Sequence, residues 1–218
     1  MSQYARMKVL ITAGPTVEPI DPVRYLTNRS SGKMGYALAT AAAKRGHSVL
    51  LISGPTSLEI PEGVDYLPIE SAADMYQAVE SQIGRHDIAI FAAAVADYSP
   101  AHVADQKLKK SGDEMTLTLT RTRDILGSAR EIMDFKGTLV GFAAETENVV
   151  GNARAKCLRK QCDLVIANDV SRQDIGFDSP ENEVTLVYPD RDEALPQDSK
   201  EHLAFHLIEI IDGLRQID

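Results

Sequence analysis

The segment from Thr12 to Gly35 most constrains the fold, because it follows an apolar strand and leads directly into a helix. A strand, a loop and a helix in this order open a βαβ unit. Free backbone N–H groups and the macrodipole make the helix N-terminus attractive to an anion. The segment therefore predicts an anion site in a parallel α/β fold, reached through a polar loop that carries Asn28.

This loop departs from both standard phosphate-binding patterns. Thr27 stands where a Walker-type loop needs glycine, and Met34 stands where that loop needs Ser or Thr. The dinucleotide fingerprint would need glycine at position 30, which is Ser30, and the second strand ends without the acidic residue that holds a ribose. These departures argue against an NAD(P)-dependent Rossmann reductase, which we keep as an alternative function.

Composition is that of an ordinary globular protein, with 44% hydrophobic and 25% charged residues. The 218 residues suffice for a full core, and we expect a single domain over 1–218. A formal net charge of −9 argues against general binding to nucleic acid or to a membrane surface. Met1–Lys8 lacks the apolar core of a signal peptide, and no spanning helix is evident, so we expect a cytoplasmic protein.

Hydrophobic periodicity predicts alternating strands and helices. Strands are expected at Met7–Ala13, Ser48–Ser53, Asp65–Ile69, Ile88–Ala96, Thr138–Ala143, Asp163–Ala167 and Glu183–Tyr188. Helices are expected at Lys33–Arg45, Ser71–Ile83, Asp124–Phe135, Asn148–Gln161 and Glu201–Leu214. Lys107–Arg121 interrupts this alternation and predicts a hairpin, with a turn at Ser111-Gly112-Asp113 and a strand at Met115–Thr120.

These elements predict an α/β fold, a doubly wound Rossmann-like parallel sheet with antiparallel additions. A second subunit could cover the exposed edges of those additions. Ligands of such sheets bind beyond the carboxyl ends of the strands. The segments that should carry the chemistry are therefore 13–28, 92–98, 142–146 and 167–170.

Two side chains at these strand ends have two interpretations each. Asp97 follows a run of alanines, and a turn or helix-capping role is as well supported as a metal or ribose contact. Phe142 is typical of a core position, although its place at a strand end also suits a platform for a base.

Basic residues gather in two places despite the acidic total. Lys107, Lys109 and Lys110 form one group, and the other comprises Arg154, Lys156, Arg159 and Lys160. A solvated face is the usual meaning of either group alone. Lys156 and Lys160 share one helical face, however, and a polyphosphate site would need both groups near the same strand ends.

Six motifs in order make the chain resemble phosphopantothenoylcysteine synthetase in its bacterial form. They are G-P-T-x-E-x-I-D-P-V-R at 14–24, N-R-S-S-G-K-M-G at 28–35, A-A-V-A-D-Y at 93–98, K-L-K-K at 107–110, G-F-A-A-E-T at 141–146 and A-N-D-V at 167–170. The resemblance implies a homodimeric ligase of coenzyme A biosynthesis. Its substrates would be 4'-phosphopantothenate and L-cysteine, with CTP as the activating nucleotide and Mg2+ as the metal.

The resemblance also implies residue roles. The nucleotide-binding residues would be Gly14, Ser31, Gly32, Phe91, Ala92, Ala93, Asp97, Lys107, Arg123, Asp124, Ile125, Leu126, Phe142, Lys156 and Lys160. Asn28 and Lys107 would be catalytic, Asn28 and Asn168 would contact substrate, and Asp97 would bind the metal.

One loop departs from the family pattern. Thr122-Arg123-Asp124 stands where members commonly have Asn-Pro-Asp or Thr-Pro-Asp, so a fixed proline turn is lost and a cation is added. Many bacterial members also carry this domain behind a flavin-dependent decarboxylase, and a free-standing synthetase and an excised domain both fit the sequence. A nucleotide-binding regulatory subunit without turnover is a further rival class.

Overall fold

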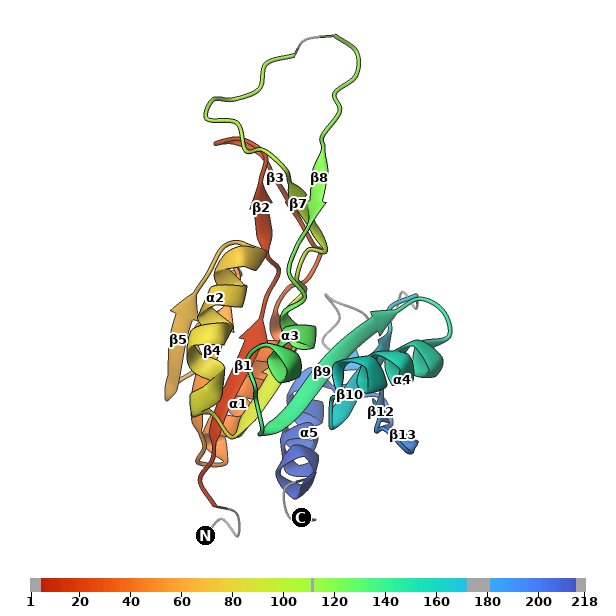
Figure 1. The fold of residues 1–218 in the computed structure, drawn as a ribbon. Helices are drawn as coiled ribbons and strands as arrows, with labels where there is room; N and C mark the ends of the chain where they lie inside the picture. Colours follow the sequence, from red (N-terminus) through yellow and green to blue (C-terminus); the bar gives the residue numbers. More distant parts are fainter. Residues whose placement is uncertain (1–4, 111, 172–180, 215–218) are drawn as a thin grey trace.

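A computed structural model describes residues 5–110, 112–171 and 181–214. Its central feature is an eight-stranded sheet in the order β13-β12-β10-β9-β6-β1-β4-β5 (Figure 1). The strands are β1 (Lys8–Ala13), β4 (Ser48–Ser53), β5 (Val64–Pro68), β6 (Ile88–Phe91), β9 (Thr138–Glu145), β10 (Leu164–Asp169), β12 (Val184–Val187) and β13 (Asp192–Ala194). All neighbours from β10 to β5 run parallel, whereas β12 and β13 are antiparallel additions at one edge.

This strand order confirms the predicted doubly wound fold. From β1 the chain builds outward to β4 and β5, and it then returns to add β6 on the other side of β1. The order therefore reverses between β1 and β6, which is where open α/β sheets hold their ligands.

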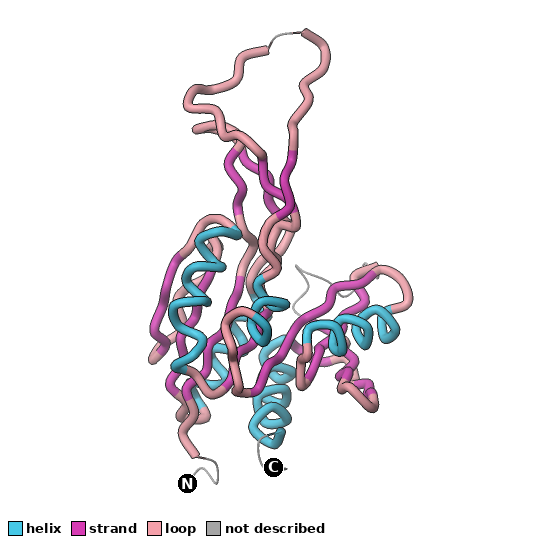
Figure 2. Tube along the Cα trace, viewed as in Figure 1, coloured by secondary structure: helices cyan, strands magenta, loops and turns pink. Residues whose placement is uncertain are grey.

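Helices cover both faces of the sheet (Figure 2). They are α1 (Lys33–Lys44), α2 (Ala72–Gln82), the short 3-10 helix η1 (Ile83–Arg85), α3 (Ile125–Glu131), α4 (Val149–Lys160) and α5 (Lys200–Leu214). Buried side chains of α1 and α5 form one apolar cluster with the sheet, and those of α2, α3 and α4 form a second cluster. Apolar residues at helical spacing explain this two-sided core.

A long excursion, residues 98–110 and 112–121, extends beyond the carboxyl ends of the strands, and we call it the arm (Figure 1). Among its described residues, strand pairing occurs only at the base, between β7 (Tyr98–Pro100) and β8 (Leu119–Arg121). The predicted strand Met115–Thr120 is therefore wrong except for its last two residues, and Ser111 of the predicted turn lies outside the described residues. No sheet face covers this stretch, and Met115 is 56% exposed.

Several further strands were not predicted. They form small antiparallel pairs, namely β2 (Val17–Pro19) with β3 (Tyr25–Thr27), and β11 (Glu181–Asn182) with β14 (Asp198–Ser199). Such pairs are too short to show a clear alternation of apolar and polar residues, so periodicity does not reveal them.

Most predicted boundaries shift by one or two residues, and two elements end several residues earlier than predicted, each for a visible reason. The strand expected to reach Ala96 ends at Phe91, because the following backbone turns to hydrogen-bond the loop after β1, with the Ala94 N–H donating to the Gly14 carbonyl at 2.9 Å. Helix α3 ends at Glu131 instead of Phe135, because Asp134 adopts a positive φ of 52° and the Phe135 N–H bonds back to the Ala129 carbonyl.

Among the described residues, we find no helix with the length and apolar character needed to cross a membrane.

Candidate functional site

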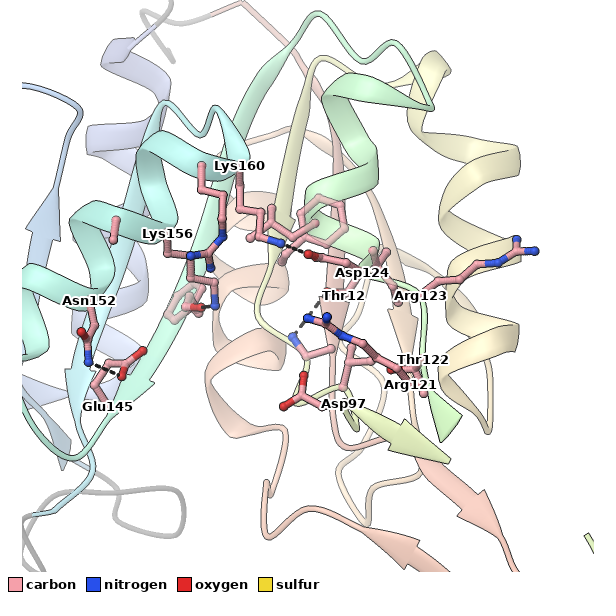
Figure 3. Close-up of a pocket in the computed structure, with 18 residues that line it drawn as sticks. Thr12, Asp97, Arg121, Thr122, Arg123, Asp124, Glu145, Asn152, Lys156 and Lys160 are labelled. Atoms are coloured by element: carbon pink, nitrogen blue, oxygen red, sulfur yellow. Dashed lines mark hydrogen bonds and ion pairs between the residues drawn. The ribbon is translucent and has the colours of Figure 1, made fainter. Parts of the chain in front are cut away.

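A cavity of about 500 Å³ opens at the carboxyl ends of β1, β6 and β9, between α3 and α4 (Figure 3). It lies beside the reversal of strand order, where the fold predicts a ligand. Its lining residues are Thr12, Phe91, Ala93, Val95, Asp97, Arg121, Thr122, Arg123, Asp124, Ile125, Leu126, Phe142, Glu145, Asn152, Ala155, Lys156, Arg159 and Lys160.

Hydrogen bonds to the end of β1 and to the loop after it hold the segment 92–96 at the cavity edge. The Ala92 N–H donates to the Thr12 carbonyl at 3.1 Å, and the Ala93 N–H donates to Thr12 Oγ1 at 3.3 Å. The Ala96 N–H donates to Thr16 Oγ1 at 3.0 Å. Because the side chains along this edge are small, a planar ligand can approach the backbone.

Two lysines of α4 bring positive charge into the cavity. Lys156 Nζ donates to the Phe142 carbonyl at 2.6 Å, and burial lowers the pKa of Lys156. Lys160 pairs with the Asp124 carboxylate. Burial also lowers the pKa of Lys160, and the nearby Arg121 guanidinium lowers it further. Desolvated cations held close together favour an anionic ligand.

The loop that departs from the family pattern is well ordered by contacts. Asp124 caps α3, with Oδ1 accepting from the Gly127 N–H at 2.9 Å. Thr122 Oγ1 donates to the Ala96 carbonyl at 2.6 Å. The Arg123 guanidinium lies 4.8 Å from the centre of the Tyr76 ring, so its charge points toward α2 and away from the lysines (Figure 3).

Ten of the residues assigned by resemblance therefore line one cavity. They are Phe91, Ala93, Asp97, Arg123, Asp124, Ile125, Leu126, Phe142, Lys156 and Lys160. Their sequence separation is large, and the parallel sheet brings them together because its strands end at one edge.

A second group lies beside the N-terminus of α1 and outside the cavity lining. It contains Gly14, Asn28, Ser31 and Gly32. Gly14 and Gly32 have positive φ values of 72° and 78°, which side chains rarely adopt. Asn28 Nδ2 donates to the Ala94 carbonyl at 2.8 Å, so Asn28 is tied to the same segment 92–96 that borders the cavity.

Three other predicted residues also lie outside the lining. Ala92 is only adjacent to it, and Lys107 is exposed on the arm. Asn168 lies on β10, and its Oδ1 is buried without a hydrogen-bond partner among the described residues. A single chain thus brings neither Lys107 nor Asn168 into the cavity.

Several lining residues were not assigned from the sequence. Arg121, Arg159, Glu145 and Asn152 all line the cavity, and Asn152 Nδ2 donates to Glu145 Oε2 at 3.0 Å. One signal was available, because Asn152, Lys156 and Lys160 follow each other at intervals of four along the helix.

A magnesium ion at this site would need only a few protein ligands. Among the residues that the structure describes, no three His, Cys, Asp or Glu side chains form a cluster suited to a metal. Mg2+ is commonly held by one or two carboxylates together with substrate phosphates. Asp97, which is exposed in the cavity lining, meets that requirement.

Comparison with known proteins gives a family match. Residues 4–214 match the family described as DNA/pantothenate metabolism flavoprotein C-terminal domain. The coenzyme A biosynthesis bifunctional protein CoaBC of Vibrio vulnificus (strain YJ016) is 50% identical over 208 residues, which are 94% of this chain and 52% of that protein. The chain therefore spans about half the length of the curated relatives it matches.

Solved structures agree on the fold. The crystal structure of the C-terminal domain of CoaBC has a TM-score of 0.85 at 39% identity and covers 100% of both chains. A Cab2 mutant in complex with phosphopantothenate-cysteine has a TM-score of 0.77 at 18% identity, covering 96% of this chain and 87% of that one. At this lower identity, the second likeness is one of fold.

Proposed function

Because the chain belongs to the DNA/pantothenate metabolism flavoprotein C-terminal domain family, we propose that it is a ligase joining 4'-phosphopantothenate to L-cysteine. The observation that carries this proposal is the cation-lined cavity at the strand-order reversal of a chain that matches one half of CoaBC. The Cab2 complex shows that a protein of this fold holds phosphopantothenate-cysteine, which is compatible with the proposal.

The chemistry explains why a nucleotide is needed. A carboxylate does not react with an amine unaided, so the phosphopantothenate carboxylate first attacks the α-phosphate of CTP and pyrophosphate leaves. The cysteine amine then attacks the acyl-cytidylate carbonyl, which forms the amide and releases CMP. Charge develops on the departing pyrophosphate, and preorganised cations stabilise it.

The residues of the cavity suit these roles. Lys156 and Lys160 would bind the triphosphate, with Arg121 and Arg159 as further cations in the same lining. Asp97 would hold Mg2+, which supplies additional positive charge to the phosphates when bound. Asn28 would donate its amide N–H to the acyl or phosphate oxygen of the intermediate.

A homodimer is part of the proposal. Many of the exposed large apolar side chains lie on the arm or on the β2–β3 hairpin that contacts it, namely Val23, Tyr25, Tyr98, Val103, Met115 and Leu119. Exposed apolar surface of this kind favours an interface, and a second copy of the chain would cover it. Lys107 lies on the same arm, so pairing of two chains offers it a route to a cavity.

A reducing compartment such as the cytoplasm suits the cysteines. Cys157 and Cys162 are both free and buried. Burial raises the pKa of Cys157 to about 11 and that of Cys162 to about 12, so neither thiol is reactive.

The deciding experiment measures pyrophosphate release by the purified chain. We expect release that requires CTP, 4'-phosphopantothenate and Mg2+, and amide product that also requires cysteine. Without cysteine, an acyl-cytidylate should be detectable by mass after quenching. Appearance of CDP and an acyl-phosphate instead would disprove the cytidylate route, and no release under any condition would disprove the ligase.

The reductase alternative has a separate test. Strand β4 ends at Ser53 and is followed by Gly54, so the acidic residue that would bind a ribose is missing at this strand end. We therefore expect no saturable binding of NADH or NADPH by titration calorimetry.

A further inference from the structure

A buried carboxylate lies beneath the arm, on the loop between β2 and β3. The Asp21 side chain is 0% exposed. Its Oδ1 accepts from the backbone N–H groups of Val23 and Arg24, each at 2.9 Å. Its Oδ2 accepts from Arg24 Nε at 3.0 Å, from Arg24 Nη2 at 2.5 Å and from the Leu108 N–H at 3.1 Å.

The same pair of side chains holds both backbone polar groups of Leu108. Asp21 accepts the Leu108 N–H, and Arg24 Nη2 donates to the Leu108 carbonyl at 2.8 Å. We call Asp21, Arg24 and Leu108 the clamp. Since Leu108 directly follows Lys107, the clamp restrains the backbone on which the Lys107 side chain stands.

Charge makes the clamp strong. The Arg24 guanidinium, together with the backbone donors, holds the pKa of the Asp21 carboxyl well below its usual range. Asp21 is therefore ionised, and hydrogen bonds to an ionised acceptor are stronger than neutral ones. Among the described residues of the arm, strand pairing is confined to β7 and β8, and one further backbone bond, from the Ala104 N–H to the Ile20 carbonyl at 3.0 Å, ties the arm to the same loop.

We propose that Asp21 is a positioning residue, which acts through Leu108 to set the location of Lys107 for the ligase reaction. This inference rests on the proposed function, together with the nucleotide-binding role that the family resemblance implies for Lys107. Asp21 itself is enclosed by the Arg24 and Leu108 groups and does not line the cavity, so its effect on catalysis must pass through the arm.

The test substitutes Asp21→Asn and measures both backbone exchange and turnover. All three hydrogen-bond partners of Oδ2 are N–H donors, so an amide NH2 group placed there would face other N–H groups. If the amide is flipped, the same conflict arises at the Val23 and Arg24 N–H groups. We expect faster hydrogen exchange at the Leu108 amide and a kcat lowered by roughly 10- to 100-fold, because small misplacements of catalytic groups have effects of this size.

A double variant identifies the route of the effect. If Asp21 acts through Lys107, Asp21→Asn combined with Lys107→Gln should be no slower than Lys107→Gln alone. The Ala101 amide, bonded to the Thr118 carbonyl at the base of the arm, provides an internal control and should keep its protection.

Glu18→Gln is the matched control for loss of a buried charge. Glu18 is 3% exposed, and its carboxylate accepts from the Ala72 N–H at 2.9 Å, at the start of α2 and away from Leu108 in sequence. This variant should lose stability but leave Leu108 exchange unchanged. Should Asp21→Asn fail to fold, Arg24→Gln carries the same measurements, because the Arg24 side chain is 40% exposed.

Two results would overturn the proposed role of Asp21. One is an unchanged rate of hydrogen exchange at the Leu108 amide in Asp21→Asn, and the other is a fully additive loss of kcat in the double variant. Full activity in Lys107→Gln would overturn this role as well, while leaving the ligase assignment intact. A wild-type chain that makes no phosphopantothenoylcysteine refutes the proposed function instead, and Leu108 exchange still decides whether Asp21 restrains the arm.

Discussion

The Lys160 ammonium pairs with the Asp124 carboxylate and so joins α4 to the start of α3 at the cavity. Asp124 also caps α3 through the Gly127 N–H, which holds this carboxylate in place. In the proposed function, a triphosphate that enters the cavity would compete with Asp124 for Lys160. The ion pair would then keep the Lys160 ammonium oriented until the nucleotide binds.

Lys160→Gln should weaken CTP binding, because it removes a positive charge from the proposed triphosphate site. We expect the KM for CTP to rise roughly tenfold, equivalent to about 1.4 kcal/mol. Lys136→Gln is the control, since the Lys136 side chain is 78% exposed and pairs with Asp134 outside the cavity. Equal KM values for the two variants would remove Lys160 from the site.

Binding of CTP should cause proton uptake at alkaline pH through Lys156. Burial lowers the pKa of this lysine in the free chain, and a triphosphate raises it by stabilising the ammonium. Titration calorimetry in buffers of different ionisation enthalpy should detect the uptake, and Lys156→Gln should abolish it. Binding without proton exchange across the alkaline range would contradict this prediction.

The same pKa shift affects folding with a defined sign. The folded pKa of Lys156 lies below the ordinary 10.5 of an unfolded lysine. Between these two values the unfolded chain holds more protons, so the Lys156 contribution to stability should rise with pH in that window. Comparison of denaturant unfolding of wild type and Lys156→Gln over this window checks the sign.

Asn28→Asp should lower turnover by at least roughly 100-fold, within the range of about 2.7–4 kcal/mol for one oxyanion donor. Aspartate removes the N–H that now reaches the Ala94 carbonyl and brings a carboxylate near phosphate oxygens. Asn28 is exposed, so the melting temperature should change little. A less stable variant that keeps its per-molecule rate would reduce Asn28 to a loop-shaping residue.

Gly35→Ala should destabilise the fold although alanine favours helices. An added Cβ would lie 2.5 Å from the Ala13 Cβ and 3.1 Å from the Ala13 Cα, against the backbone of β1. Overpacking of about 1–3 kcal/mol should exceed the helix-propensity gain of about 1 kcal/mol. Gly84→Ala, where a Cβ meets nothing within 4 Å, is the control, and equal unfolding midpoints would refute the clash.

Replacement of exposed apolar residues of the arm should dissociate the proposed dimer. We expect the wild-type chain to sediment with the mass of two chains, and Tyr98→Asp combined with Leu119→Asp to sediment with the mass of one. Both side chains are exposed at the base of the arm, so the monomer should stay folded. A wild-type mass near one chain at micromolar concentration would refute the dimer.

The sequence by itself determined most strands and helices of the sheet and the edge at which the cavity opens. Hydrophobic periodicity reports which face of each element is buried, and parallel strands end at one edge, so Phe142 could be placed at that edge. Phe91 was expected inside a longer strand, and the structure shows that it ends β6. Helical spacing likewise predicted that Lys156 and Lys160 share a face, and both line the cavity.

Tertiary structure alone decided which arginine side chains point into the cavity and which residues hold the arm. Arg123, the added cation, lies over Tyr76, whereas the unassigned Arg121 lines the cavity. Asp21 binds the Leu108 N–H across 87 residues of sequence. Local periodicity carries no information about such pairs, because their geometry depends on how distant segments pack after the chain has folded.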